Sequence, residues 1–462
     1  MLFNIFLFKL LVANTILTPL YFLLKHIFRI FIKKLTQMKK VFASIVLCAV
    51  AIAHIHAAYI LLPMDLKQKE HLKAYGMTYW VLQKDVEAHW LLNYRGGSFA
   101  FLHKPSFEKE CKTRGVSYEV ISDAEFANIQ REIQNPETNM EDMKLEVPPK
   151  IAVYTPETTI KGQQVQPWDD AVTMVLNYAE IPYTTIYDRD VIEGKLALYD
   201  WIHLHHEDFT GQYGRFYRSH GTTAWYRDNQ RKAEDLAHAL GFAKVSQCKL
   251  AVAKKIKEFV AGGGFMFAMC SATDSYDIAL AAEGVDICAS MYDGDAADPN
   301  AQEKLDFSKT FAFKDFQLIK DPYVYEFSSI DNYMNRPSSP ETDYFTLFDF
   351  SAKWDPVPTM LTQNHTRIVK GFMGQTTAFK KQYLKSDVII LGETKPYSEV
   401  RYLHGVMGQG FFTFYGGHDP EDYQHSVDDP VTDLSLHPNS PGYRLILNNI
   451  LFPAAKKKHR KT

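Results

Sequence analysis

The chain has 462 residues, of which 46% are hydrophobic and 14% aromatic, and its formal net charge is −3. Such a chain can bury a large core in roughly two or three domains, which excludes a disordered protein. Residues 1–57 carry seven Lys or Arg and no Asp or Glu, so removing them changes the net charge from −3 to −10. This acidic balance excludes broad nucleic-acid binding, which needs a basic face to displace counterions from phosphates.

The N-terminal region contains two apolar runs. Residues 38–57 combine Met-Lys-Lys, an apolar run and a small-residue end at Ala57, which is typical of a signal peptide. The upstream run Leu10–Leu24 is short for a membrane span. We therefore interpret 1–37 as an extension from a start assigned upstream of Met38, with a true membrane anchor as the alternative. The mature protein is expected to be periplasmic or extracellular and to meet a membrane only through this N-terminal targeting segment.

Residues 58–145 have the pattern of a small α+β module. Tyr79–Leu82 and Ser98–Leu102 are apolar runs of strand length, and residues 95–97 (Arg-Gly-Gly) favour a turn. Gln134–Lys150 is rich in proline and acidic residues and is interpreted as a linker.

Strand and helix patterns alternate after the linker, which implies βαβ crossovers and a mostly parallel sheet in an α/β domain over 150–455. The segment Asp293–Arg367 lacks this rhythm and is interpreted as an insertion, and residues 456–462 as a solvated basic tail. The expected strands are Lys150–Tyr154, Pro182–Tyr187, Leu198–Leu204, Phe265–Met269, Val388–Leu391, Val400–Leu403 and Phe411–Tyr415, and the expected helices are Trp168–Ala179, Leu250–Ala261, Ser271–Ala282 and Tyr443–Leu451.

Cys270 stands between an apolar strand and a helix. A nucleophile at such a sharp turn is lifted clear of the sheet, and the helix N-terminus behind it favours the thiolate. Small residues lie two positions away on each side, Ala268 and Ala272. The alternative is a buried structural thiol, since free cysteine is among the most buried residue types.

His418 follows a predicted strand and two glycines, and carboxylates come next at Asp419 and Glu421. A histidine in this position can act as a general base that an acid orients. The alternative is a polar loop in which Asp and Pro form a turn.

A third polar group follows the strand Leu198–Leu204. The alternation of side chains along a strand puts His203 and His205 on one face. These imidazoles and the carboxylate of Glu207 are therefore candidate ligands of a metal such as zinc. The alternatives are ordinary polar packing and contact with a substrate. We expect no cofactor, and no metal beyond this weak candidate. Because open α/β sheets bind ligands beyond the carboxyl ends of their strands, we expect one cleft for a small molecule or carbohydrate. Its ligand-binding residues are predicted to be His203, His205, His206, Glu207, Asp208 and Asp274.

Four cysteines remain after removal of the signal peptide, at positions 111, 248, 270 and 288. In an oxidising compartment this even count allows two disulfides, with three alternative pairings.

From about Lys150 to Phe452 the chain resembles the class I glutamine amidotransferase-like superfamily. The shared features are Gly262-Gly263-Gly264 leading to Cys270, and a late strand that ends in Gly417-His418; the ending most resembles the ThuA-like branch. The resemblance implies a flavodoxin-like fold with Cys270 as nucleophile, His418 as base, and Glu421 or Asp419 orienting the base. This chain departs from the superfamily pattern in two places: alanines replace the elbow glycines, and the His-x-Glu spacing is one residue longer.

The segments 91–98, 203–211 and 360–366 also resemble a family of bacterial envelope proteins usually labelled asparagine synthetase B. Such a synthetase has an N-terminal cysteine nucleophile and a Ser-Gly-Gly-x-Asp-Ser loop, whereas the mature end here is Ala58-Tyr59 and the loop Cys270–Ser275 has no glycine. The motifs therefore disfavour asparagine synthesis.

If the protein is an enzyme, its expected chemistry is thiol-dependent hydrolysis or transfer at an amide. The first alternative is a non-catalytic module for a carbohydrate or cell-wall fragment, which aromatic side chains suit. The second is a structural envelope protein. The aromatic residues that suggested glycan binding are Trp168, Trp201, Tyr213, Trp225 and Tyr226.

Overall fold

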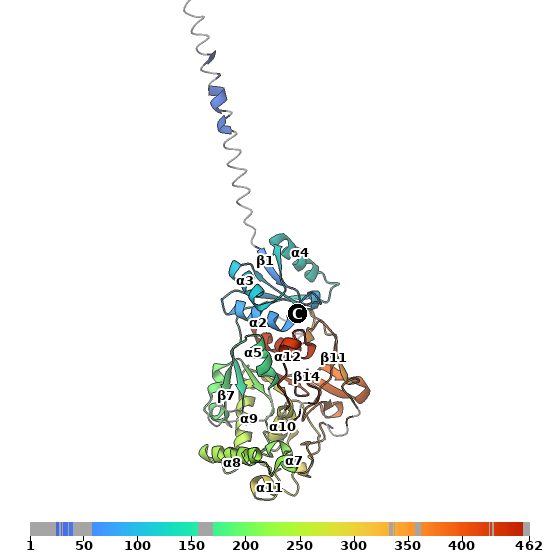
Figure 1. The fold of residues 1–462 in the computed structure, drawn as a ribbon. Coiled ribbons are helices and arrows are strands. Elements are labelled where there is room, and N and C mark those ends of the chain that lie inside the picture. The colour runs from blue at the N-terminus through green and yellow to red at the C-terminus, as the bar shows by residue number, and fades with distance from the viewer. Residues whose placement is uncertain are drawn as a thin grey trace, which may run out of the picture. The chain divides into compact units, whose positions relative to one another are not determined.

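The computed structural model in Figure 1 describes residues 25, 26, 29, 31–35, 37–39, 58–155, 170–331, 336, 338–355, 362–424, 426 and 429–455. The chain divides into two compact units, Met1–Ala57 and Ala58–Thr462. The described residues of the first unit are helical, and most of the predicted extension 1–37 and signal peptide 38–57 lies outside the described residues. Within the described part of the chain, no helix is long and apolar enough to cross a membrane.

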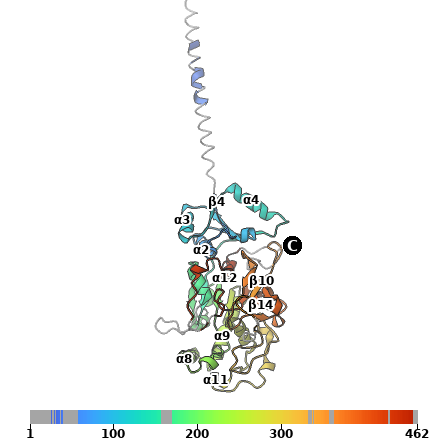
Figure 2. The same ribbon diagram turned by 45° about the vertical axis from the view of Figure 1, so that its right-hand side comes forward.

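Residues 58–145 form an antiparallel sheet that helices cover on both faces. Its strand order is β4-β1-β3-β2-β5. Leu61, Leu91 and Ala100 cluster with residues of α4, and their strand neighbours cluster with residues of α2 and α3. The helices α4 and α2 lie on opposite sides of this sheet (Figure 2). The elements are β1 (Ala58–Leu62), α2 (His71–Leu82), β2 (Ala88–Leu92), β3 (Ser98–Leu102), α3 (Pro105–Arg114), β4 (Glu119–Ser122), α4 (Asp123–Gln134) and β5 (Glu141–Leu145).

Two local predictions in this region are wrong. Tyr79–Leu82 is predicted as a strand, but it is the last turn of α2. This helix is buried on nearly all sides, so its sequence lacks the alternation of apolar and polar residues that distinguishes a helix from a strand. The predicted linker contains the strand β5, which pairs with β2. The side chains of β5 alternate between the two faces of the sheet, and those of Met143 and Leu145 are buried.

The second sheet is mixed, so the protein is a mixed α/β protein and the predicted mostly parallel order is not confirmed. The described strands run β11-β10-β13-β14-β15-β9-β8-β6-β7, with β12 beside β14. The five neighbours β15, β9, β8, β6 and β7 are parallel, and the other pairs are antiparallel. The strands are β6 (Ile151–Tyr154), β7 (Thr184–Ile186), β8 (Trp201–Leu204), β9 (Phe265–Met269), β10 (Tyr344–Leu347), β11 (Ile368–Lys370), β12 (Phe379–Lys380), β13 (Ile389–Thr394), β14 (Glu399–Met407) and β15 (Gly410–Tyr415).

The antiparallel half has two local causes. The turn after Met407 is so short that β15 must return beside β14, since parallel neighbours need a long crossover. The predicted insertion 293–367 is not wholly outside the sheet either, because it supplies β10, which pairs with β13.

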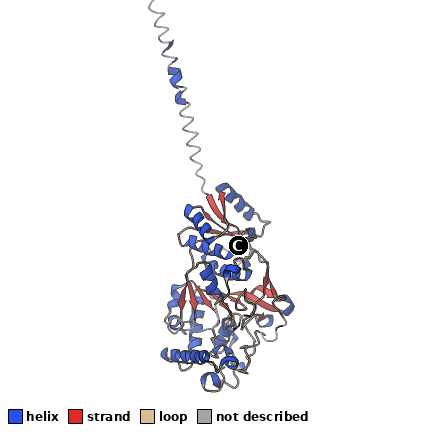
Figure 3. Cartoon of the chain, in the orientation of Figure 1, coloured by secondary structure: helices blue, strands red, loops and turns tan. Residues whose placement is uncertain are grey.

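Helices lie on both sides of the second sheet (Figure 3). The N-cap of α5 is Asp170, whose carboxylate accepts from the Thr173 N–H at 2.8 Å. The α-helices are α5 (Ala171–Tyr178), α6 (Asp188–Ile192), α7 (Tyr217–His220), α8 (Ala224–Ala239), α9 (Val245–Ala261), α10 (Ser271–Ala281), α11 (Ser290–Asp293) and α12 (Pro441–Leu451).

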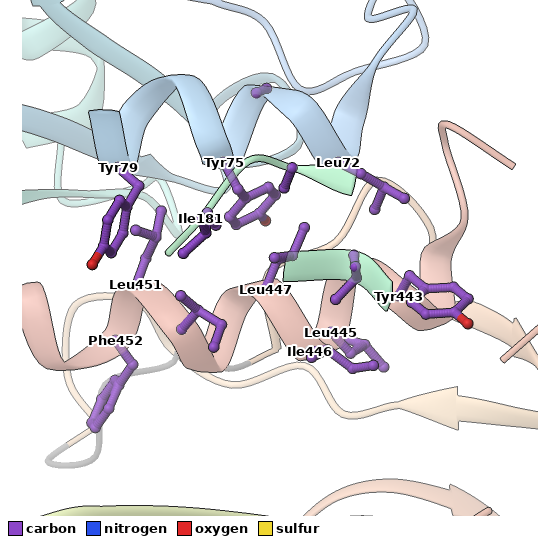
Figure 4. Packing of buried hydrophobic residues seen from close by; sticks show 14 of the residues in the cluster. Leu72, Tyr75, Tyr79, Ile181, Tyr443, Leu445, Ile446, Leu447, Leu451 and Phe452 are labelled. Carbon is purple, nitrogen blue, oxygen red and sulfur yellow. The ribbon is translucent and has the colours of Figure 1, made fainter. Parts of the chain in front are cut away.

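One hydrophobic cluster joins the two sheets within the second unit. Figure 4 shows Tyr75 and Tyr79 of α2 facing Leu447 and Leu451 of α12, with Ile181 between the helices. Because α12 also covers the large sheet, one apolar face of each sheet is buried in this shared cluster.

Arg444 of α12 is fully buried at this junction. Its guanidinium donates to the Tyr75 hydroxyl at 2.9 Å, to the Met64 carbonyl at 3.2 Å and to the Gly96 carbonyl, and it lies 3.2 Å from a ring nitrogen of His365. A fixed fork of donors therefore satisfies several buried acceptors of the small module at once.

We expect Arg444→Met to lower the free energy of unfolding by about 3 kcal/mol, because it leaves buried carbonyl and hydroxyl groups without their donor. Urea denaturation followed by circular dichroism measures this loss. The matched control is Arg231→Met on α8, where the side chain is 60% exposed and a change within about 0.5 kcal/mol is expected. Equal losses in the two variants would contradict the role of Arg444.

Candidate functional site

The candidate site lies at the carboxyl ends of three neighbouring parallel strands, β8, β9 and β15. His205 and His206 follow β8, Cys270 follows β9, and His418 comes three residues after β15. One ring nitrogen or sulfur atom from each of these four residues lies within 4.8 Å of the others. The structure thus brings together side chains from three distant segments.

The backbone at Cys270 is strained. Its φ of 53° and ψ of −141° lie outside the helical and strand regions, although Cys270 carries a side chain. The positions two residues before and after Cys270 hold Ala268 and Ala272, which are fully buried. Their small side chains fit the tight turn in place of the glycines that a nucleophile elbow usually has. The Cys270 N–H donates to the Gly417 carbonyl at 3.2 Å and holds the elbow against the end of β15. Such strain at a strand-to-helix turn is typical of a nucleophile elbow.

Cys270 is buried, with 4% of the residue exposed. Burial raises its pKa to about 11, and hydrogen bonds from the backbone N–H groups of Gln375, Ser271 and Thr376 act in the opposite direction. Cys288 donates its thiol to the Thr210 carbonyl at 3.3 Å. All four cysteines from position 111 onward are free thiols, so none of the disulfide pairings that their even number allows is present among them.

Close backbone packing fixes the loop that carries His418. Gly417 has a φ of +100°, and a Cβ atom there would lie 2.5 Å from the Phe372 ring. A Cβ atom at Gly374 would lie 2.8 Å from the His418 nitrogen. The His418 N–H donates to the Met373 carbonyl at 2.9 Å. These glycines let segment 372–377 cross directly beside the end of β15.

The histidines of β8 share a carboxylate that the sequence reasoning did not select. Asp170 lies 3.2 Å from Nε2 of His203 and 3.3 Å from Nδ1 of His205. Although burial opposes it, the two imidazoles hold the pKa of Asp170 well below its usual range. Burial lowers the pKa of His205, and Asp170 acts against this shift. The capping pattern of α5 identifies Asp170 as a helix start, but nothing in its local sequence points to the site.

Three imidazole rings pack against one another at this edge of the sheet. Ring centroids are 3.8 Å apart for His205 and His206, 4.4 Å for His206 and His418, and 4.9 Å for His205 and His418. His203 is one layer deeper, with Nδ1 at 3.2 Å from the Phe267 carbonyl, and is fully buried.

The two acids expected to orient His418 have other partners. Asp419 accepts from the hydroxyls of Tyr443 and Thr432, both at 2.7 Å. Glu421 lies 3.1 Å from Nδ1 of His437.

The remaining predicted residues also have separate contacts. Glu207 lies 3.4 Å from the Lys249 ammonium, and burial raises its pKa to about 7 against the effect of Lys249. Asp208 accepts from backbone N–H groups of Thr210 at 2.7 Å and Gly214 at 2.9 Å. Asp274 accepts from the Thr376 hydroxyl at 2.8 Å, and burial raises its pKa to about 8.

The metal set suggested by alternation, His203, His205 and Glu207, does not come together. Alternation holds only while the strand continues, and β8 ends at Leu204. Beyond that point the chain turns, so Glu207 faces Lys249 while His206 joins the cluster instead.

A cavity of about 950 Å³ opens over the site, and His206, Cys270 and His418 line it. Its other walls come from residues 215–220, 319–331 and 373–375, which sequence reasoning did not assign to a site. Gln375 helps fix the walls, since its amide donates to the carbonyls of Gly214 at 2.6 Å and Tyr325 at 3.1 Å.

The aromatic residues that suggested glycan binding lie mostly in the core. Trp201, Tyr213 and Tyr226 are at most 9% exposed, Trp225 packs against the same cluster, and Trp168 lies outside the described residues. That argument from sequence is therefore wrong for the buried residues.

Comparison with known proteins gives no family. No protein-family model matches the chain, and no curated protein matches it. Among solved structures, cytoplasmic protein STM3548 from Salmonella typhimurium has a TM-score of 0.31 and 11% identity over 67% of this chain and 100% of its own. Cytoplasmic protein STM1381 from the same organism has a TM-score of 0.34 and 10% identity over 66% of this chain and 100% of its own. Gan42B, a GH42 beta-galactosidase, has a TM-score of 0.25 and 11% identity over 59% of this chain and 28% of its own. Similarities this weak carry no conclusion about fold or activity.

We expect Gly417→Ala to lower the free energy of unfolding by about 1–3 kcal/mol, because an alanine at this positive φ is strained and meets the Phe372 ring. Thermal and urea denaturation measure the change. The control is Gly262→Ala at the end of α9, where φ is −78° and a change within about 0.5 kcal/mol is expected. If Gly417→Ala is neutral, the close packing around His418 is not what positions that loop.

Proposed function

We propose that the protein is a thiol-dependent hydrolase or transferase that acts on an amide bond, with Cys270 as nucleophile and His418 as base. One observation carries the proposal: a strained strand-to-helix elbow presents Cys270 beside His418 at the wall of a large cavity. The 4.8 Å limit on their separation exceeds a hydrogen bond. Catalytic contacts are often long before substrate binds and shorten in the complex.

The chemistry needs a proton to move from sulfur to nitrogen and on to the leaving group. His418 takes the proton of the Cys270 thiol while sulfur bonds to the amide carbonyl carbon. The carbon–nitrogen bond then breaks, and the imidazolium returns the proton to the departing amine. Water, or an acceptor amine in a transferase, attacks the thioester and restores the thiol.

Backbone donors near the sulfur suit the charge that develops on the carbonyl oxygen. The N–H groups of Ser271, Gln375 and Thr376 hydrogen-bond toward Sγ. Ser271 directly follows the nucleophile, the position that supplies an oxyanion-hole donor in hydrolases with this kind of elbow.

The resemblance to class I amidotransferases and their ThuA-like branch belongs to the same proposal. The parallel run β15, β9, β8, β6, β7 is compatible with a flavodoxin-like core to which the antiparallel strands are added. The sequence of residues 38–57 supports export to the periplasm or the extracellular space. Asparagine synthesis as implied by the envelope-family label is disfavoured, because the loop Cys270–Ser275 has no glycine that would let backbone amides close around a phosphate.

We expect a glutamine-analogue chloroketone, added with EDTA to remove adventitious metal, to form one covalent adduct on the protein. Intact-mass analysis should find no adduct in Cys270→Ala. The adduct should persist in Cys111→Ala, which removes a buried thiol of the small module. His418→Gln should slow adduct formation by about 100-fold if the imidazole acts as a base. An adduct that survives in Cys270→Ala, or no adduct at all, contradicts the proposal.

A non-catalytic carbohydrate-binding module is the second candidate. Phe216, Tyr323 and Tyr325 line the cavity, and Tyr323 is 51% exposed, so an aromatic surface is available where a sugar ring could stack. Thermal-shift screening against glycans and cell-wall fragments tests this candidate. A stabilising ligand whose effect disappears in Tyr323→Ala but not in Tyr344→Ala, an exposed residue on β10, would favour it. No hit across a broad panel would count against it.

A further inference from the structure

We propose that His205, His206, His418 and Cys270 form a binding site for a divalent transition-metal ion, with Zn²⁺ as the preferred ion. Three imidazole nitrogens and one thiolate sulfur make a four-ligand set that zinc binds in tetrahedral geometry. Hard ions such as Mg²⁺ and Ca²⁺ prefer oxygen ligands and do not suit it. The inference goes beyond the proposed catalysis and does not depend on it.

The spacing of the four side chains is close to that of a formed site. Zinc-to-nitrogen bonds of about 2.0 Å and zinc-to-sulfur bonds of about 2.3 Å place neighbouring ligand atoms about 3.3–3.6 Å apart. The corresponding atoms here all lie within 4.8 Å of one another. Side-chain rotations that shorten the longest separation by about 1 Å would therefore complete the tetrahedron.

Asp170 adds an independent feature that points to a metal. Its carboxylate lies 3.3 Å from Nδ1 of His205, which leaves Nε2 of that ring for coordination. A carboxylate behind a metal-binding histidine fixes the tautomer and the ring orientation and strengthens the ligand. His205 is 2% exposed, so the ring has little freedom to turn away.

The ligands also stand on a rigid frame. Each follows one of three hydrogen-bonded parallel strands, and the elbow at Cys270 is tied to Gly417 by a 3.2 Å hydrogen bond. Sites built on rigid elements hold the ligand geometry that a metal requires. His206, Cys270 and His418 line the cavity, so an ion at their centre would be reachable from it.

Among the residues that the structure describes, two other groups of metal-type side chains are weaker candidates. The first group consists of Asp170, His203 and His205, and it shares His205 with the proposed site. Both ring nitrogens of His203 already have an oxygen partner: Nδ1 faces the Phe267 carbonyl, and Nε2 faces the Asp170 carboxylate. Asp286, Cys288 and Asp293 form the other group. The Lys244 ammonium lies 2.5 Å from Asp286 and 3.0 Å from Asp293, so this group already has its cation.

Metal binding has a direct consequence for the thiol. A Zn²⁺ ion on Sγ of Cys270 withdraws electron density from the sulfur and so lowers its nucleophilicity. Zn²⁺ should therefore slow the alkylation of Cys270 by iodoacetamide.

The test titrates the chelator-stripped protein with Co²⁺ and then with Zn²⁺. We expect one equivalent of Co²⁺ to give a thiolate-to-cobalt charge-transfer band and tetrahedral visible bands, and Zn²⁺ to displace it. Cys270→Ser should lose the charge-transfer band. His206→Ala should weaken Zn²⁺ binding by more than about 100-fold, and Asp170→Asn, which keeps every ligand, by about 10–100-fold. His220→Ala, which lines the same cavity outside the cluster, should bind Zn²⁺ as the wild type does.

Thermal melts of the metal-free variants show whether each one is folded before its affinity is compared. No stoichiometric Co²⁺ or Zn²⁺ binding by the folded wild type, or equal affinity in the wild type, Cys270→Ser and His206→Ala, overturns the proposal. Chloroketone labelling of Cys270 without metal binding would refute the metal site and keep the thiol chemistry. Metal binding without chloroketone labelling would refute the thiol chemistry and keep the metal site.

Discussion

The alignment of three parallel strands is the constraint on which the site depends. In β8, β9 and β15 the hydrogen-bond register puts Leu204 beside Ala268 and Met269 beside Tyr415. Strands in parallel register end at the same level, so the residues that follow them must share a small volume. Backbone pairing, rather than any direct attraction between the imidazoles and the thiol, gathers the four side chains. A shift of one residue in β15 would move His418 out of the cluster.

Gathering these groups has a cost that the surrounding structure offsets. Burial of polar rings and a thiol is unfavourable unless each finds hydrogen-bond partners. Asp170 is the hydrogen-bond partner of His203 and lies 3.3 Å from Nδ1 of His205, where its charge stabilises the imidazole ring. The backbone N–H groups of segment 375–376 act in the same way on the sulfur of Cys270. The strained backbone of Cys270 persists because hydrogen bonds hold it on both sides, from its N–H to Gly417 and from Thr273 to its carbonyl. Rigid strands below and a crossing loop above therefore keep an unfavourable arrangement in place.

Sequence reasoning found the parts of the site that depend on local pattern. The strand Phe265–Met269, the elbow at Cys270 and the strand before Gly416 follow from short apolar runs bounded by glycine or a helix start. Their convergence followed from the rule that ligands bind beyond strand ends. Asp170 and Gln375 could not be found in this way, because their contacts cross from one segment to another with no local signature. The role of Glu207 was mistaken because alternation was extended past the end of β8.

The segment 294–331 shows how a stretch with little regular secondary structure can still build a cavity wall. Asp277 of α10 accepts three backbone N–H groups, from Phe311, Ala312 and Phe313, at 2.6, 2.7 and 2.9 Å. Buried Arg215 donates to the carbonyls of Val324 at 2.9 Å and Ile319 at 3.0 Å. Single charged side chains thus replace the ladder of a sheet and satisfy several backbone groups each. The helix α10 begins directly after Cys270. Through Asp277, the same helix also anchors residues 311–313, which lead into the cavity wall formed by residues 319–331.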